Sequence, residues 1–185
     1  QDEMNSLLDM PSAVWDGKLW VDEEGHEYIG RGIKKCPRRV GIISQGLIVA
    51  NSKIIDGLLE QEYECVIVDE AHRARRKNLG EGKEDHSPNP NNLYRFLLGI
   101  SIKTKSMLLA TATPIQMYPI ELWDLMNILS QKNDSVLGSP ASYWRKRTMI
   151  QRSLNLIMGK EKMGFFNPEN WEWIRNPFPP GYENF

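Results

Sequence analysis

The sequence predicts an α/β fold in which a parallel sheet is flanked by helices. Two short apolar runs, residues 66–68 and 106–110, have the composition of buried strands in such a sheet. The segments 93–100 and 120–129 have the pattern of helices that pack beside those strands. With 185 residues, of which 41% are hydrophobic, the chain is long enough to form a domain with its own core.

The first 38 residues predict a hairpin that embellishes the fold without joining its central sheet. Within the run 13–21, Asp16 and Gly17 can supply the positive φ angles of a tight primed turn between two short apolar segments. A core strand over 39–44 should follow, and then a helix over about 45–59. An acidic turn leads from that helix to the strand at about 64–68.

The second half of the chain alternates loop, helix and strand. Residues 79–92 are rich in Gly, Pro and Asn and predict a loop, at whose end Asn91 or Asn92 can cap the helix over 93–100. Pro119 suits the first position of the helix over 120–129. We therefore expect three parts, over 1–38, 39–138 and 139–185.

The third part, 139–185, predicts a helix over about 141–158 and then a tail rich in aromatic residues and proline. That tail either packs its rings onto the domain as a strap or offers them to a partner or to nucleic acid. The sequence favours the strap, because aromatic side chains are more often buried than functional.

Two adjacent carboxylates, Asp69 and Glu70, follow the first apolar strand. Ligands of open α/β sheets collect at the carboxyl ends of the strands, so these side chains are predicted to lie where a phosphate would bind. The first carboxylate can hold Mg²⁺ and the second can activate a water molecule. A bare Asp-Glu pair could equally mark an acidic helix N-terminus. The complete Asp69-Glu70-Ala71-His72 string is much rarer, at about once in a thousand chains of this length.

A second motif follows the second apolar strand and reads Thr111-Ala112-Thr113-Pro114. Together the two motifs resemble motifs II and III of the superfamily two helicases. Three longer strings, DEAHRARRKN from Asp69, LLATATPIQ from Leu108 and ELWDL from Glu121, resemble the Swi/Snf-type branch of ATP-driven translocases on double-stranded DNA. Residues 42–48 lie where that family has its motif Ib. The resemblance covers roughly residues 39–129 and implies a RecA-like lobe.

The resemblance implies a role for each motif residue in ATP hydrolysis. Asp69 would bind the Mg²⁺ of ATP, and Glu70 would contact the nucleotide and act as the base. His72 would link the nucleotide site to motif III by a hydrogen bond near Thr111 or Thr113, although by position it could be an early-helix polar residue. The two threonines could relay that link or simply form the turn. Gln116 matches a family position after Thr-Pro.

A phosphate-binding loop is missing from the motifs. Such a loop ends in Gly-Lys-Ser/Thr after a strand, and the Gly-Lys pairs of this sequence are followed by Leu or Glu. We therefore expect a fragment: the later half of the first RecA-like lobe. It would be inactive alone and would depend on a phosphate-loop segment and a second lobe in the same polypeptide. The alternative is a helicase-derived binding or regulatory module that hydrolyses nothing.

Basic residues gather in clusters although the formal net charge is −1, from 23 basic and 24 acidic residues. The first cluster follows the carboxylates and contains Arg73, Arg75, Arg76 and Lys77. Others are Lys34, Lys35, Arg38 and Arg39, and Arg145, Lys146 and Arg147. Such clusters can bind backbone phosphates without reading bases, or can form solvated surface. The resemblance favours the first cluster as a contact to double-stranded DNA.

Cysteine content and hydropathy indicate an intracellular protein. The two cysteines, Cys36 and Cys65, have no metal-ligand spacing, and Cys65 is predicted to be a small buried residue of its strand. No apolar run approaches the roughly 20 residues that span a bilayer, and the polar start is no signal peptide. We expect a cytoplasmic location, or a nuclear one in a eukaryote, with no membrane partner.

Overall fold

The computed structural model describes residues 1–50, 52–80, 83, 86, 88–140 and 142–160. The chain divides into two units, Gln1–Tyr63 and Glu64–Phe185, each with its own packing. Together they form a mixed α/β structure with a small sheet that contains a parallel strand pair. The aromatic, Pro-rich tail predicted after residue 158 lies almost entirely outside the described residues.

The first unit is built on a four-stranded sheet with the order β3-β2-β1-β4. Its strands are β1 (Ser12–Trp15), β2 (Trp20–Val21), β3 (Glu27–Tyr28) and β4 (Val40–Ile43). β1 runs antiparallel to β2 and parallel to β4, with Ala13 opposite Gly41. The predicted hairpin and the strand predicted at 39–44 therefore share one sheet, so the expectation that the hairpin stays outside the sheet of that core strand is wrong. Ala13 and Trp20 of this sheet are buried.

The turn of the hairpin uses a side chain in place of the expected primed backbone geometry. The Asp16 carboxylate accepts the backbone N–H groups of Lys18 at 2.7 Å and Leu19 at 2.9 Å. Gly17 has φ +112°, but Asp16 does not adopt a positive φ, which a type I′ turn requires at both central residues. The prediction of a hairpin is confirmed, and the prediction of a primed turn is wrong because Asp16 forms an Asx turn.

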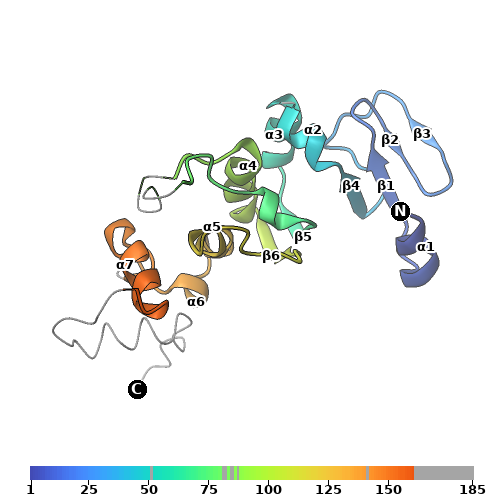
Figure 1. Cartoon of the computed structure of the whole chain (residues 1–185). Coiled ribbons are helices and arrows are strands. Elements are labelled where there is room, and N and C mark those ends of the chain that lie inside the picture. The colour runs from blue at the N-terminus through green and yellow to red at the C-terminus, as the bar shows by residue number, and fades with distance from the viewer. Residues whose placement is uncertain (51, 81–82, 84–85, 87, 141, 161–185) are drawn as a thin grey trace, which may run out of the picture. The chain divides into compact units, whose positions relative to one another are not determined.

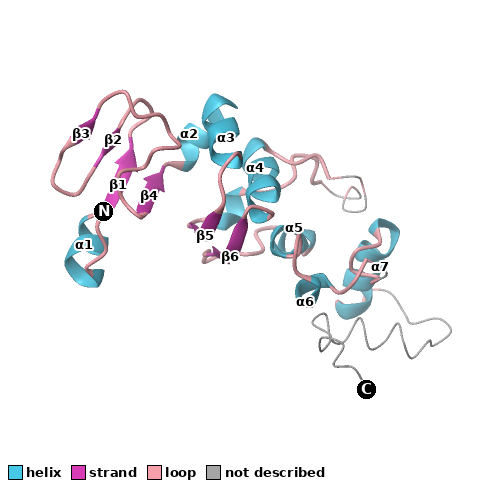
Figure 2. Ribbon diagram, turned by 180° about the vertical axis from the view of Figure 1, so that it is seen from behind, coloured by secondary structure: helices cyan, strands magenta, loops and turns pink. Residues whose placement is uncertain are grey.

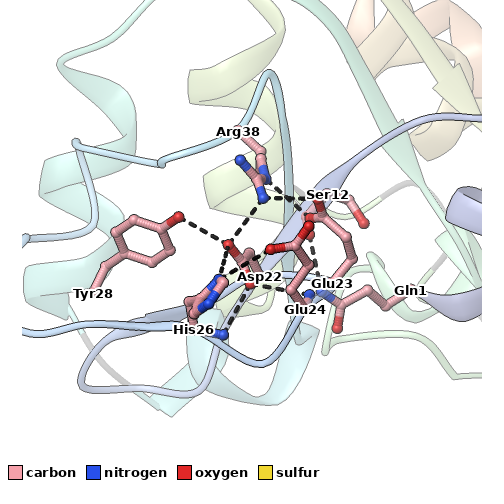
Figure 3. Close-up of polar contacts among 8 residues, drawn as sticks. All are labelled: Gln1, Ser12, Asp22, Glu23, Glu24, His26, Tyr28 and Arg38. Atoms are coloured by element: carbon pink, nitrogen blue, oxygen red, sulfur yellow. Dashed lines mark hydrogen bonds and ion pairs between the residues drawn. The ribbon is translucent and has the colours of Figure 1, made fainter.

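A buried carboxylate closes the other end of this hairpin. Asp22 accepts hydrogen bonds from the hydroxyl of Tyr28 at 2.8 Å and from the guanidinium of Arg38 at 3.0 Å (Figure 3). Its second oxygen accepts the backbone N–H groups of Glu24 and His26. Burial works to raise the pKa of Asp22, but these donors outweigh it and lower the pKa to about 2.

The helices of the first unit are α1 (Asp2–Leu8), α2 (Gln45–Ala50) and α3 (Ser52–Leu59). The helix predicted over 45–59 thus corresponds to α2 and α3, with residue 51 outside the described part of the chain. Ile48 of α2 and Ile54 and Leu58 of α3 are buried, as apolar residues at helical spacing should be.

The second unit contains the paired strands β5 (Tyr63–Val68) and β6 (Thr104–Leu109), which lie side by side (Figure 1). Only one face of this pair is covered. Val68 is 8% exposed, whereas Ile67 is 66% exposed and Leu108 is 56% exposed. Cys65, two residues before Ile67, is exposed as well. The prediction of buried strands with a buried Cys65 is therefore wrong for one face, because no described residue of the second unit packs on it.

A short 3-10 helix, η1 (Ala71–Arg73), follows β5, and the remaining helices are α4 (Asn92–Ser101), α5 (Ile120–Leu129), α6 (Asp134–Leu137) and α7 (Arg147–Ile157) (Figure 2). Asn91 caps α4 by accepting the N–H of Tyr94 at 2.8 Å, and α5 has the predicted bounds with Pro119 before it. The helix predicted over 141–158 is shorter than expected, since α7 begins only at residue 147. A core cluster joins α5, α6 and α7, and its buried members are Ile120, Trp123, Leu137, Trp144 and Ile150.

Candidate functional site

The carboxylates predicted for catalysis lie on a strained turn at the end of β5. Asp69 and Glu70 are exposed, and Glu70 adopts the left-handed conformation with φ +47° and ψ +45°. Its backbone N–H donates to the Asp69 carboxylate at 2.8 Å. A non-glycine residue in this region costs roughly 1–3 kcal/mol and persists only where the surroundings hold it. The turn is therefore held by contacts outside it.

Those contacts come from the end of β6. The N–H of Ala110 donates to the carbonyl of Val68 at 2.8 Å, and the N–H of Ala71 donates to the carbonyl of Ala110 at 2.9 Å. Ala71 has no exposed surface. The two strand ends are thus joined immediately before both motifs, so that the residues following β5 face those following β6.

A side-chain link then connects the two motifs. Nδ1 of His72 lies 3.1 Å from a Glu70 carboxylate oxygen and 3.0 Å from the hydroxyl oxygen of Thr111. The Thr111 hydroxyl also accepts the backbone N–H of Thr113 at 3.2 Å. The expected contact of His72 with a motif III threonine is present, and Thr111 makes it. Thr113 joins the link through its backbone.

Gln116 makes hydrogen bonds with Arg75, which follows the first motif, and with Glu121 of α5. Its side-chain oxygen accepts a hydrogen bond from Nη1 of Arg75 at 2.9 Å. Its backbone N–H donates to Glu121 at 2.8 Å, and the same Glu121 oxygen accepts the N–H groups of Met117 at 2.8 Å and Tyr118 at 3.1 Å. Glu121 is 7% exposed, so this carboxylate orders the loop from inside.

The sequence alone predicts no such role for Glu121. The available signal was an acidic residue in the first turn of a predicted helix, where carboxylates accept free backbone N–H groups. That signal identifies a cap. It does not reveal that the capped loop carries Gln116.

Arg76, predicted to contact DNA, faces the interior and is 4% exposed. Its guanidinium donates twice to Asp124 of α5, from Nε at 2.9 Å and from Nη2 at 2.5 Å. The Tyr94 hydroxyl donates to the same carboxylate at 3.2 Å and accepts from Asn127 at 3.1 Å. Burial raises the pKa of Asp124, and the Arg76 guanidinium opposes that rise. The expectation for Arg76 is corrected, because its side chain is buried and its charge is paired with Asp124.

The other members of this basic cluster, Arg73, Arg75 and Lys77, are exposed. The motif residues are thus brought together in two groups. Glu70, His72, Thr111 and Thr113 form one linked group, while Gln116 contacts Arg75.

The donors at the turn suit Mg²⁺ when a nucleotide supplies the rest of its ligands. Among the described residues, no group of three or more His, Cys, Asp or Glu side chains is placed to hold a metal ion. Mg²⁺ is commonly bound through one or two carboxylates together with water and phosphate oxygens. The exposed carboxylates of Asp69 and Glu70 are donors of this kind.

Comparison of the chain with protein-family models, with curated proteins and with solved structures finds no match. None of the helices in the described ranges has the length and apolar character needed to cross a membrane.

Proposed function

We propose that this chain is part of an ATP-dependent translocase on double-stranded DNA, of the helicase-like ATPase class. The observation that carries the proposal is the link from Glu70 through His72 to Thr111, between two motifs that follow neighbouring strands. An acidic helix N-terminus would not need that link. An ATPase would need it, because the nucleotide site must respond to the segment that follows β6.

In the proposed reaction each carboxylate has one task. Asp69 would hold the Mg²⁺ of ATP, and the ion would supply positive charge next to the phosphates. Glu70 orients the attacking water and accepts its proton, while His72 and Thr111 keep that carboxylate directed at the water. Thr113 and Gln116 follow on the same loop. In this proposal, their contacts with Thr111 and Arg75 couple nucleotide binding to the conformation of that loop.

The proposed activity depends on a phosphate-binding loop and a second lobe from the remainder of the polypeptide. The uncovered side chains of Ile67 and Leu108 favour this view. Parallel sheets of α/β proteins are covered on both faces, and apolar side chains gain about 25 cal/mol per Å² when they are buried. We expect additional chain of the same polypeptide to cover this face.

The alternative is a helicase-derived binding or regulatory module without hydrolysis. The missing phosphate-loop motif is the feature that favours it. The two functions differ in one requirement, since only an ATPase needs the carboxylate of Glu70.

The test is Glu70→Gln in a polypeptide that carries this chain together with a phosphate-binding loop. Nucleotide binding should persist, and DNA-stimulated hydrolysis should fall at least about 100-fold, as expected for loss of a general base. Glu64→Gln is the matched control, because it removes an exposed carboxylate from β5 itself. Turnover close to wild type in Glu70→Gln would reject the role of Glu70.

A second measurement concerns the isolated 185-residue chain. It should show no DNA-stimulated ATP hydrolysis, because the sequence has no loop to bind the phosphates. Robust turnover by this chain would contradict its dependence on additional segments.

A further inference from the structure

The segment after the acidic turn is an extended edge with two unlike sides. Arg76 and Pro90 form an antiparallel bridge, Asn91 donates to the carbonyl of Arg75, and Lys77 donates to the carbonyl of Asn89. Alternate side chains of an extended segment point in opposite directions. Ala74 and Arg76 are accordingly buried at 1% and 4% exposure.

The opposite side of this segment carries only cationic side chains. Arg73, Arg75 and Lys77 are all exposed. Arg75 is also oriented, because Gln116 accepts a hydrogen bond from one of its five N–H groups and leaves the others available. The buried carboxylate of Asp124 is paired with Arg76 on the inner side.

We infer that Arg73, Arg75 and Lys77 form a cationic edge that binds the phosphate backbone of double-stranded DNA. The inference rests on the proposed function for its choice of DNA as the polyanion. It assigns the contact to three residues, excludes Arg76, and gives Gln116 the role of positioning Arg75.

The spacing of the cationic edge fits a phosphate backbone. Side chains two residues apart on an extended strand are separated by roughly 6.6 Å, and Arg73 closes the 3-10 helix η1, so the edge spans less than about 13 Å. Phosphates of one DNA strand follow one another at about 3.4 Å along the helix axis, so an edge of this length can reach one phosphate with each of its three cations. No base-reading group is needed, which suits a protein that must move along DNA of any sequence.

The test is the salt dependence of binding of this chain to a duplex of about 20 base pairs, followed by fluorescence anisotropy. Each phosphate contact contributes about −0.9 to the slope of log K against log salt. Replacing Arg73, Arg75 and Lys77 together by Gln should therefore reduce the slope by about 2.7. Between 50 and 200 mM salt, wild type should lose about 40-fold more affinity than the triple variant.

The matched control replaces Arg31, Lys34 and Lys35 of the first unit by Gln, which removes the same charge from another exposed loop. It should leave the slope unchanged. A charge-preserving variant, Arg73→Lys with Arg75→Lys, should restore the slope of wild type. Melting curves establish that each variant is folded.

Three results would overturn the inference: no binding at 50 mM salt, an equal change of slope in both triple variants, or equal affinity for polyglutamate. Failure of the proposed function would give a different combination of ATP-turnover and DNA-binding results. In that case Glu70→Gln would leave ATP turnover intact while the cationic edge still bound DNA.

Discussion

Replacing Asp124 by alanine should remove much of the stability of the unit that carries the site. Asp124 is fully buried and accepts two hydrogen bonds from Arg76 and one from Tyr94. The alanine variant would leave the Arg76 guanidinium, whose side chain is 3% exposed, without its counter-charge. Breaking a buried pair from one side costs about 3–5 kcal/mol, which is a large part of the roughly 5–15 kcal/mol that stabilises a domain.

Urea unfolding measures this loss directly. With a slope near 2 kcal/mol per molar, the midpoint for the second unit should fall by about 1.5–2.5 M. Circular dichroism at 222 nm follows its helices, and tryptophan fluorescence includes Trp123, whose ring lies 6.0 Å from the Arg76 guanidinium carbon.

Two further variants test whether the loss arises from the buried charge. Arg76→Met combined with Asp124→Leu should recover most of the stability, because a buried pair replaced by apolar residues of similar size costs little. Glu64→Ala breaks an ion pair with Lys105 whose side chains are 82% and 73% exposed, and should cost less than about 1 kcal/mol. If Asp124→Ala costs no more than Glu64→Ala, the buried ion pair does not hold the unit together.

Two predictions concern the first unit. The pKa of Asp22 is lowered to about 2 from an ordinary value of 3.8, so its contribution to stability is present above about pH 4 and is lost as the pH falls towards 2 (Figure 3). Acid unfolding followed by tryptophan fluorescence should show this loss of stability. The Asp22→Asn variant should not show it. Gly17→Ala should destabilise the hairpin by about 1–3 kcal/mol, because Gly17 has φ +112° and a Cβ there would lie 3.2 Å from Leu47. Gly32→Ala, which meets nothing within 4 Å, is the control for thermal unfolding, and equal melting temperatures of the two variants would refute the argument.

Local patterns predicted much of the second unit. The apolar runs that became β5 and β6 were recognisable from composition, and the cap of α4 by Asn91 followed from the residue type at a helix start. The bounds of α5 followed from Pro119 and a helical apolar pattern. These features depend on neighbours within a few residues, so a single sequence contains the information.

The long-range partners were not predictable in the same way. Arg73, Arg75, Arg76 and Lys77 look alike in sequence, yet only Arg76 is buried, because it lies on the side of an extended segment that faces Asp124, 48 residues later. The exposure of Cys65 and Ile67 likewise depends on what covers the sheet, which no local pattern reports.

The sequence by itself therefore determined where β5, β6, α4 and α5 lie, and that Asp69, Glu70, Thr111 and Thr113 follow the ends of two strands, whereas α1, β3 and α6 were not predicted. Only the tertiary structure decided that His72 meets Thr111, that Glu121 orders the Gln116 loop, and that Arg76 is structural while its neighbours are exposed. The physical reason is the distance along the sequence over which each interaction acts. Backbone preferences and apolar periodicity act between near neighbours, whereas burial and ion pairing depend on residues that folding alone brings together.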